Sequence, residues 1–262
     1  MAKAFYYDSG GLLEATINDG TLSSNNFSDA DTMTNEEKLI DQSIATAVSG
    51  FGNTDAFKIT FATSTALDFI ALYFSSAETD NLSFQREVAT NTYTSVSNIS
   101  TDFVVGWNIA EFSSASSENW IISPTGDIAN LTEIITGSKL EFEINPDIGI
   151  LESDNFGVDL TKSLGGVQYA LKRHNPIQTI TLSFSSISNT FKTSLQSMQD
   201  DVQNFKKFIY SENGTSGPFH YVRLEKPMKF KEVSSQRFSV NISLVEQLSW
   251  FYFIIIMLNF LP

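Results

Sequence analysis

Carboxylates are the side chains of this sequence most able to do chemistry, because 30 Asp and Glu residues stand against 16 Lys and Arg. Several occur as close pairs: Asp29/Asp31, Glu36/Glu37, Glu78/Asp80 and Asp200/Asp201. Hydrolysis of a glycosidic bond needs two carboxylates about 5–10 Å apart across a cleft, and neighbours in sequence do not define such a cleft. We interpret these pairs as solvated surface charge and predict neither a catalytic centre nor a metal site.

Histidine and cysteine are scarce in this sequence. It contains no cysteine, which excludes a disulfide, a thiolate zinc site and a cysteine nucleophile. Its two histidines, His174 and His220, lie far apart and neither has a Ser–His–Asp context. Acid–base catalysis at neutral pH relies mainly on histidine. We therefore expect a protein that is not an enzyme and needs no cofactor.

The net charge is unevenly distributed along the chain. Residues 1–147 carry 5 basic and 21 acidic side chains, a net charge of −16, whereas residues 148–262 carry 11 basic and 9 acidic ones, a net charge of +2. An acidic first half repels phosphates, so we expect no nucleic-acid partner. It indicates either a well-solvated exposed domain or electrostatic complementarity to a more basic neighbour.

Three residues of the acidic half are candidate glycan contacts. Trp107 and Trp120 lie on predicted strands, in VVGWNI and NWIIS. Aromatic rings of this kind stack on sugars, but they also fill β-sheet cores, so core burial stays open as the alternative. Arg86 is one of the few cations in this half and either pairs with a nearby glutamate or hydrogen-bonds a ligand.

The clearest periodic segment is a helix predicted over residues 189–209. Its apolar residues recur at intervals of three and four, which is typical of one helix face; they are Phe191, Leu195, Met198, Val202, Phe205, Phe208 and Ile209. Strands are predicted on either side, in ITLSF and in RFSVNISL, where apolar residues alternate. This pattern indicates a helix packed on a sheet.

The rest of the chain indicates a mainly β protein. FKITF, LDFIALYF, LSFQ, TDFVVGWNI, ENWIISP, LTEIIT and LEFEI read as short strands separated by turn-forming residues. We predict a β-sandwich over residues 1–147 and a connector without periodicity over 148–166. A second β domain with one amphipathic helix is predicted over 167–248, followed by an apolar segment at 249–262.

The first of these domains resembles a known fold family. The order of LIDQ, FKITF, LDFIALYF, TDFVVGWNI and WIISP…IANLTEIITGSKLEF, within residues 38–142, is similar to the galactose-binding-like jelly roll. That resemblance implies a carbohydrate-binding module or host-surface adhesin with a surface glycan as its partner. A glycan-active enzyme is the weaker alternative, since no catalytic motif accompanies it.

The second domain resembles the minor tail and distal tail proteins of long-tailed bacteriophages. The similar segments are Ile180–Phe184, Phe191–Ile209, Gly217–Leu224 and Arg237–Gln247. The resemblance implies a tail-hub-like β-sandwich or barrel in a structural virion protein. Such a protein forms a ring, a hexamer or a trimer, at the distal tail tip or baseplate hub. It links the tail tube to tip or receptor-binding proteins, so the tube, the hub and the fibre are the expected partners.

The ends of the chain carry two further expectations. MAKAFYYDSGG lacks the apolar core of a signal peptide, so we expect synthesis in the host bacterial cytoplasm and incorporation into the virion. Residues 250–258 are nine consecutive apolar side chains, too few to span a membrane. We expect this segment to be covered by its own chain or a neighbouring copy. The alternatives are another tail protein, membrane contact or an error in the gene model. The candidate interface residues are Phe219, His220, Tyr221, Trp250, Phe251, Tyr252 and Phe253.

Overall fold

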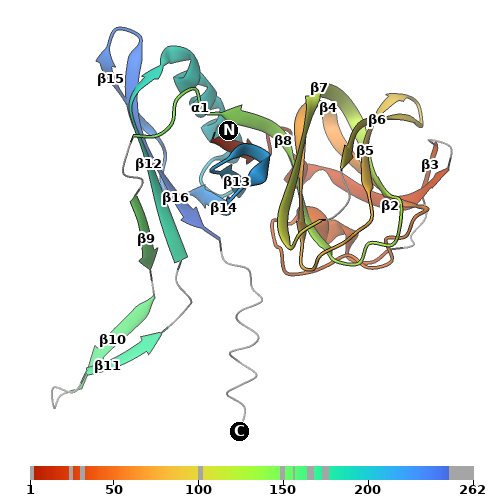
Figure 1. The fold of residues 1–262 in the computed structure, drawn as a ribbon, viewed down its shortest axis with the longest axis horizontal. Helices are drawn as coiled ribbons and strands as arrows, with labels where there is room; N and C mark the ends of the chain where they lie inside the picture. The colour runs from red at the N-terminus through yellow and green to blue at the C-terminus, as the bar shows by residue number, and fades with distance from the viewer. Residues whose placement is uncertain are drawn as a thin grey trace. The chain divides into compact units, whose positions relative to one another are not determined.

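A computed structural model describes residues 3–23, 26–29, 33–99, 103–147, 151–155, 157–163, 168–172 and 177–247. These residues form a mainly β structure with one α-helix, which confirms the fold class predicted from the sequence (Figure 1). The chain divides into two compact units. Unit 1 comprises Met1–Glu141 and Phe208–Phe219, and unit 2 comprises Phe142–Lys207 and His220–Leu248.

Unit 1 is built on one long antiparallel sheet with the strand order β6-β5-β7-β4-β8-β1-β13, to which β2 and β3 are added along β4. Its strands are β1 (Ala4–Tyr7), β2 (Thr16–Ser23), β3 (Asn26–Asp29), β4 (Asp55–Phe74), β5 (Leu82–Ala89), β6 (Thr92–Ile99), β7 (Gly106–Pro124), β8 (Leu131–Glu141) and β13 (Phe208–Ser211). Three short 3₁₀ helices connect them: Leu12–Glu14, Glu36–Ile40 and Gly214–Ser216.

Strand β4 organises unit 1, and its sequence explains why. In its first part Phe57, Ile59 and Phe61 alternate with exposed or half-buried residues, so this part has one buried face. Its second part, residues 67–74, is apolar apart from Asp68, and residues on both of its faces are buried. Ile70 joins the main core, whereas Phe69 packs on the other face against Tyr6, with ring centroids 5.1 Å apart.

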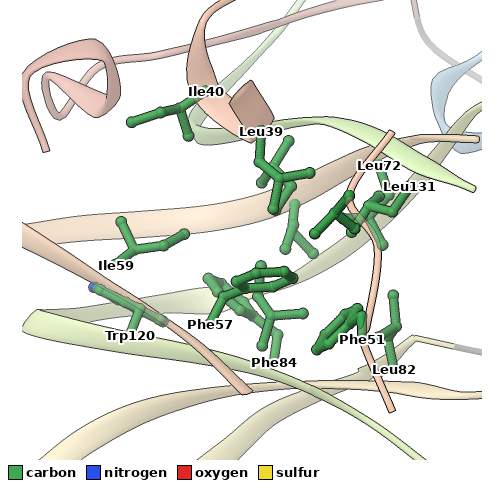
Figure 2. Packing of buried hydrophobic residues seen from close by; sticks show 14 of the residues in the cluster. Leu39, Ile40, Phe51, Phe57, Ile59, Leu72, Leu82, Phe84, Trp120 and Leu131 are labelled. Carbon is green, nitrogen blue, oxygen red and sulfur yellow. The ribbon is translucent and has the colours of Figure 1, made fainter. Parts of the chain in front are cut away.

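The main core of unit 1 lies against this sheet (Figure 2). Phe57 and Trp120 contribute from β4 and β7, and Leu39 contributes from the 3₁₀ helix Glu36–Ile40. Each of these three side chains is fully buried. The strands are much longer than the short segments predicted: β4 joins FKITF to LDFIALYF, and β7 joins GWNI to ENWIISP.

Within unit 2, antiparallel strands pair in the order β14-β16-β12-β9. Its strands are β9 (Leu151–Asn155), β12 (Ile177–Ser188), β14 (Phe219–Leu224), β15 (Lys229–Ser234) and β16 (Arg237–Glu246). Strand β15 pairs with β16 as well. Val240, Ile242 and Leu244 of β16 are buried at alternate positions, as the sequence predicted.

Helix α1 (Asn189–Val202) covers the unit 2 sheet with one apolar stripe. Phe191, Leu195, Met198 and Val202 are its buried residues. The helix begins at Ser188, whose hydroxyl accepts a hydrogen bond from the Phe191 amide at 3.0 Å and so satisfies one free N–H of the first turn.

The prediction that this helix extends to residue 209 is wrong. The helix ends at Val202, and Gln203 adopts a positive φ of 50°. Phe208 and Ile209 belong instead to β13, where Ile209 pairs with Tyr6 of β1. Phe205, expected on the buried stripe, is 59% exposed. The helical spacing of these residues is overridden by a long-range strand pairing that the local sequence does not encode.

The predicted connector and domain limits also differ from the structure. Residues 148–166 were expected to lack regular structure, yet β9 and β10 (Val158–Lys162) lie within them. Unit 1 ends at Glu141 rather than at residue 147, and it regains Phe208–Phe219 from the second half of the chain. The pairing of β1 with β13 explains this return, because β1 needs a partner on each side within the sheet.

Candidate functional site

The three expected glycan contacts do not form one exposed surface. Trp120 is fully buried: it stacks on Phe84 with ring centroids 5.0 Å apart, and its Nε1 donates to the Ser117 carbonyl at 3.0 Å. The prediction that it contacts a glycan is therefore wrong, since the ring fills the core. Trp107 is only 6% exposed and packs edge-on against Tyr73.

Arg86 is the third of these residues and lies half-buried on β5. Its Nη1 donates to the Ser116 carbonyl at 3.2 Å, which ties β5 to β7. In the strand register Arg86 is directly opposite Trp120. This arrangement gives Arg86 a structural contact within the sheet.

The expected interface residues are only partly described. Phe219 and His220 are half-buried at the start of β14, whereas Tyr221 is buried with the Lys207 ammonium 5.5 Å from its ring centroid. Trp250, Phe251, Tyr252 and Phe253 lie outside the described residues. Their assignment to an interface stays a prediction.

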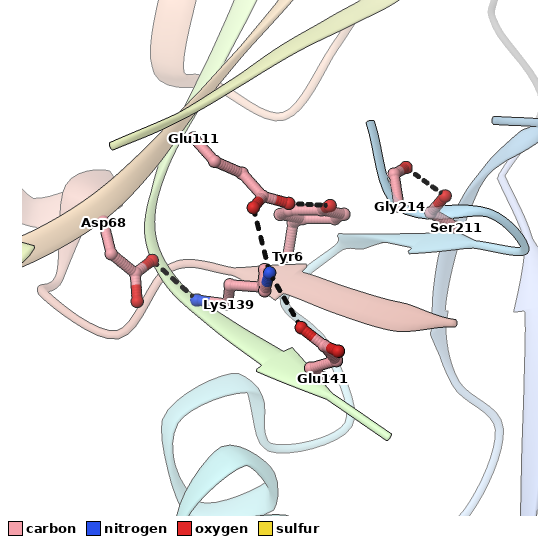
Figure 3. A network of polar contacts seen from close by, with 7 residues as sticks. All are labelled: Tyr6, Asp68, Glu111, Lys139, Glu141, Ser211 and Gly214. Carbon is pink, nitrogen blue, oxygen red and sulfur yellow. Dashed lines mark hydrogen bonds and ion pairs between the residues drawn. The ribbon is translucent and has the colours of Figure 1, made fainter. Parts of the chain in front are cut away.

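A polar network crosses four strands of unit 1 (Figure 3). The Tyr6 hydroxyl donates to Glu111 Oε1 at 2.6 Å, and Lys139 Nζ donates to Glu111 Oε2 at 2.9 Å. The same ammonium lies 3.0 Å from Glu141 Oε2, and the Lys139 amide donates to Asp68 Oδ1 at 2.8 Å. No local sequence pattern predicts this network, because its members are up to 135 residues apart in the chain.

Burial and neighbouring charge shift three pKa values in this network. Burial, followed by the hydrogen bond to Glu111, raises the pKa of Tyr6 well above its ordinary range. Burial also raises the pKa of Asp68. Burial lowers the pKa of Lys139, but its bonds to Glu111 and Glu141 outweigh that effect and raise it. Tyr6 and Lys139 thus stay protonated donors, which suits a tie between strands rather than proton transfer.

The loops at one end of unit 1, residues 75–81 and 125–130, form a second polar feature that we call the loop end. The Thr125 amide donates to the Asn81 carbonyl at 2.9 Å, and the Ser75 amide donates to the Asn130 carbonyl at 3.0 Å. Glu78 Oε1 accepts from Asn130 Nδ2 at 2.6 Å. The loop end is therefore held together by bonds between its two loops.

Two aspartates are presented by the loop end. Asp80 lies against Gly126 so closely that a Cβ added to this glycine would come 2.2 Å from the Asp80 carboxyl. Asp127 is exposed and lies beside Gly52. Carboxylate oxygens accept hydrogen bonds from hydroxyl groups. Among the described residues no group of three or more His, Cys, Asp or Glu side chains could hold a metal ion.

In unit 2, β10 and β11 (Gln168–Lys172) form a two-stranded sheet of their own, which we call the arm (Figure 1). Val158 and Leu160 alternate onto one face of the arm and are 47% and 63% exposed. Tyr169, paired with Thr161, lies on the opposite face and is 62% exposed. The arm was not predicted from the sequence, although apolar and polar residues alternate in VDLTK.

Unit 2 also carries a surface hollow of about 460 Å³ at the end of α1. It is lined by Gln199, Asp200, Gln203, Asn204 and Pro227. No helix in the described part of the chain is both long and apolar enough to cross a membrane.

No protein-family model and no curated protein matches the chain. Among solved structures it is similar to chitosan-binding module 1 from a chitosanase/glucanase of Paenibacillus sp. IK-5, at 11% identity and a TM-score of 0.38, over 51% of this chain and 100% of that one. Chitosan-binding module 2 from the same enzyme, in complex with chitotriose, gives 12% identity and a TM-score of 0.37, over 48% and 98%. A family 89 glycoside hydrolase from Clostridium perfringens gives 13% and 0.39, over 51% of this chain and 15% of that one.

Proposed function

We propose that the protein is a structural, non-catalytic subunit that assembles with copies of itself, of the kind built into the tail tip of a long-tailed bacteriophage. The observation that carries this proposal is the arm of unit 2. A two-stranded ribbon is marginally stable in water unless it packs against something. The arm pairs as a separate sheet and exposes apolar side chains on both faces.

The energetics favour a covered arm. Burying a large apolar side chain from full exposure contributes roughly 1.5–3 kcal/mol. Val158, Leu160 and Tyr169 start about half exposed, so covering all three contributes roughly 2–5 kcal/mol per copy. That gain repeats at every contact of a closed ring, where it offsets part of the free energy that association costs.

A second copy of the chain is the proposed occupant. A contact in which the arm of one copy meets a different surface of the next is heterologous, and such contacts close into rings when the rotation allows. The order of elements in unit 2 supports the tail-protein resemblance. The strand containing Ile180–Phe184, helix α1, β14 and β16 occur in the expected order along the chain, with β13 and β15 between them. In this proposal the ring joins the tail tube to tip or receptor-binding proteins.

The proposal is tested by negative-stain microscopy and light scattering of the purified chain. Rings are expected for the natural sequence, and monomers for the double variant Leu160→Ser/Tyr169→Ser. The control is Val88→Ser, which removes a similarly exposed apolar side chain (52%) from β5 of unit 1. Monomers from the natural sequence, or rings from the double variant, would contradict assembly through the arm.

Carbohydrate binding by unit 1 is the second candidate function, and the loop end is the observation that favours it. Carboxylate oxygens accept hydrogen bonds from sugar hydroxyls, and the two loops that carry Asp80 and Asp127 are tied together by backbone hydrogen bonds. In this candidate Asp80 and Asp127 take the role that the sequence suggested for the tryptophans. The module would then attach the assembly to a glycan of the host surface.

A glycan array probed with the whole chain tests this second function. Binding should be lost in Asp80→Asn/Asp127→Asn and kept in Glu118→Gln, which removes one exposed carboxylate of β7. A panel of the bound glycans should show no turnover. Hydrolysis abolished by a single carboxylate change would refute the non-catalytic assignment.

A further inference from the structure

The hollow at the end of α1 is an open surface depression, and most of its lining side chains are exposed. Its volume of about 460 Å³ lies within the range of roughly 300–1,000 Å³ that small-molecule sites occupy. Four of its five lining residues are Asp, Asn or Gln, and Pro227 supplies an apolar surface. The site lies wholly within unit 2, away from the arm residues in sequence and in a different unit from the loop end.

The lining groups define the chemistry of the ligand. Gln203 and Asn204 each offer an amide NH₂ as donor and an amide oxygen as acceptor. Gln199 is fixed in place because its Oε1 accepts from the Met228 amide at 2.5 Å, so its NH₂ group remains as a donor. Asp200 adds carboxylate acceptors. Such a set matches neighbouring hydroxyl groups, each of which donates and accepts one bond.

The backbone at the hollow is held in an uncommon conformation. Gln203 has φ 50° and ψ −134°, a region that residues other than glycine seldom occupy. Two bonds maintain it: the Gln203 amide donates to the Gln199 carbonyl at 2.7 Å, and the Lys206 amide donates to the Val202 carbonyl at 3.1 Å. Strained backbone of this kind concentrates at functional sites. Gln203 is one of the residues that line the hollow.

We propose that this hollow binds a single sugar ring or a similar polyol. The amides and Asp200 would bond the hydroxyl edge, and Pro227 would pack against the C–H face of the ring. One carboxylate among five lining residues does not make a metal site, and one proline does not make an apolar pocket. The site is open and polar, so the affinity is weak, with a Kd of about 1 mM. This inference does not depend on assembly or on the loop end.

Saturation-transfer NMR of the whole chain with glucose, galactose and N-acetylglucosamine tests the proposal, because the method reads weak binding to large assemblies. At least one sugar should receive saturation. Its Kd should rise at least tenfold in Gln203→Ala/Asn204→Ala and stay unchanged in Gln196→Ala, an exposed glutamine of the same helix outside the hollow. Circular dichroism checks the fold of each variant.

Two further comparisons complete the test. If the double variant does not fold, the exposed single change Asp200→Asn should still raise the Kd severalfold. Loss of binding in Asp80→Asn/Asp127→Asn, with binding kept in the hollow variants, would place the sugar at the loop end and overturn the proposal. The absence of saturation transfer from all three sugars would overturn it as well.

Discussion

Lys139 couples two carboxylates across β7 and β8, and breaking that coupling gives a measurable prediction. Its Nζ lies 2.9 Å from Glu111 and 3.0 Å from Glu141. Replacing Lys139 with Met keeps the aliphatic stem but removes the ammonium. Glu111 then keeps only its bond from Tyr6 among these contacts, and two carboxylates face one another without a cation between them.

The expected coupling free energy between Lys139 and Glu111 follows from the distance between their charges and from the exposure of both side chains. Two unit charges about 4 Å apart attract by roughly 4 kcal/mol at an effective dielectric constant of about 20. The side chains of Lys139 and Glu111 are 25% and 32% exposed, so desolvation and solvent screening take back most of this attraction. We expect a net coupling of about 1–1.5 kcal/mol between the two, above the range of about 0.2–1 kcal/mol for fully exposed pairs.

A double-mutant cycle measures this coupling. Lys139→Met, Glu111→Gln and the double variant are compared with the natural sequence by urea unfolding. The control cycle uses Glu37→Gln and Lys38→Met, an ion pair 3.7 Å apart with exposures of 61% and 44%, which should couple by less than about 0.5 kcal/mol. A Lys139–Glu111 coupling as small as that of the control pair would refute the reasoning.

Two further predictions concern stability. Ser188→Ala removes the hydroxyl that accepts from Phe191 and donates to Glu143. This change should lower the free energy of unfolding by about 1 kcal/mol and the Tm by about 2–4 °C. The control Ser197→Ala, on the exposed helix face, should leave the Tm unchanged. Burial raises the pKa of Asp68 in the folded protein. The charged carboxylate therefore lowers the free energy of unfolding at neutral pH. This destabilisation disappears as the pH falls through the raised pKa and the carboxyl becomes protonated. Compared with Asp68→Asn, the natural protein should gain stability between pH 7 and about pH 4, and a relative loss in urea unfolding over that window would contradict the assignment.

The sequence predicted elements whose apolar period was local and unbroken. Strand β16, with Val240, Ile242 and Leu244 buried in alternation, and the first three turns of α1 follow from pattern alone. The segment LDFIALYF was correctly expected to be a strand, although β4 extends well beyond it.

Polar strands and long-range pairings escaped prediction for physical reasons. The stretch SSASSEN of β7 has no apolar period, yet it is a strand because it pairs with β4, where the Thr60 hydroxyl donates to Asn119 at 2.8 Å. The pairing of β1 with β13 joins segments about 200 residues apart, and no local window contains both. The candidate site residues were the hardest to predict. Trp120, for example, is buried because of the residues that pack opposite it, such as Phe84, and its own sequence context does not show this.

The end of α1 offers a last prediction, which separates stability from binding. Gln203 holds φ 50° and ψ −134°, a conformation that costs a residue with a side chain about 1–3 kcal/mol and costs glycine almost nothing. Gln203→Gly removes that strain but adds about 0.5–1 kcal/mol of chain entropy to the unfolded state. The balance of these two effects predicts that the free energy of unfolding rises by about 1 kcal/mol and the Tm by about 2–4 °C. Sugar binding should become at least tenfold weaker. Gln203→Ala should weaken binding to the same extent without raising the Tm, because alanine keeps the strain. A lower Tm for the glycine variant would show that the Gln203 side chain stabilises the fold, and its amide would then be a structural group rather than a ligand contact.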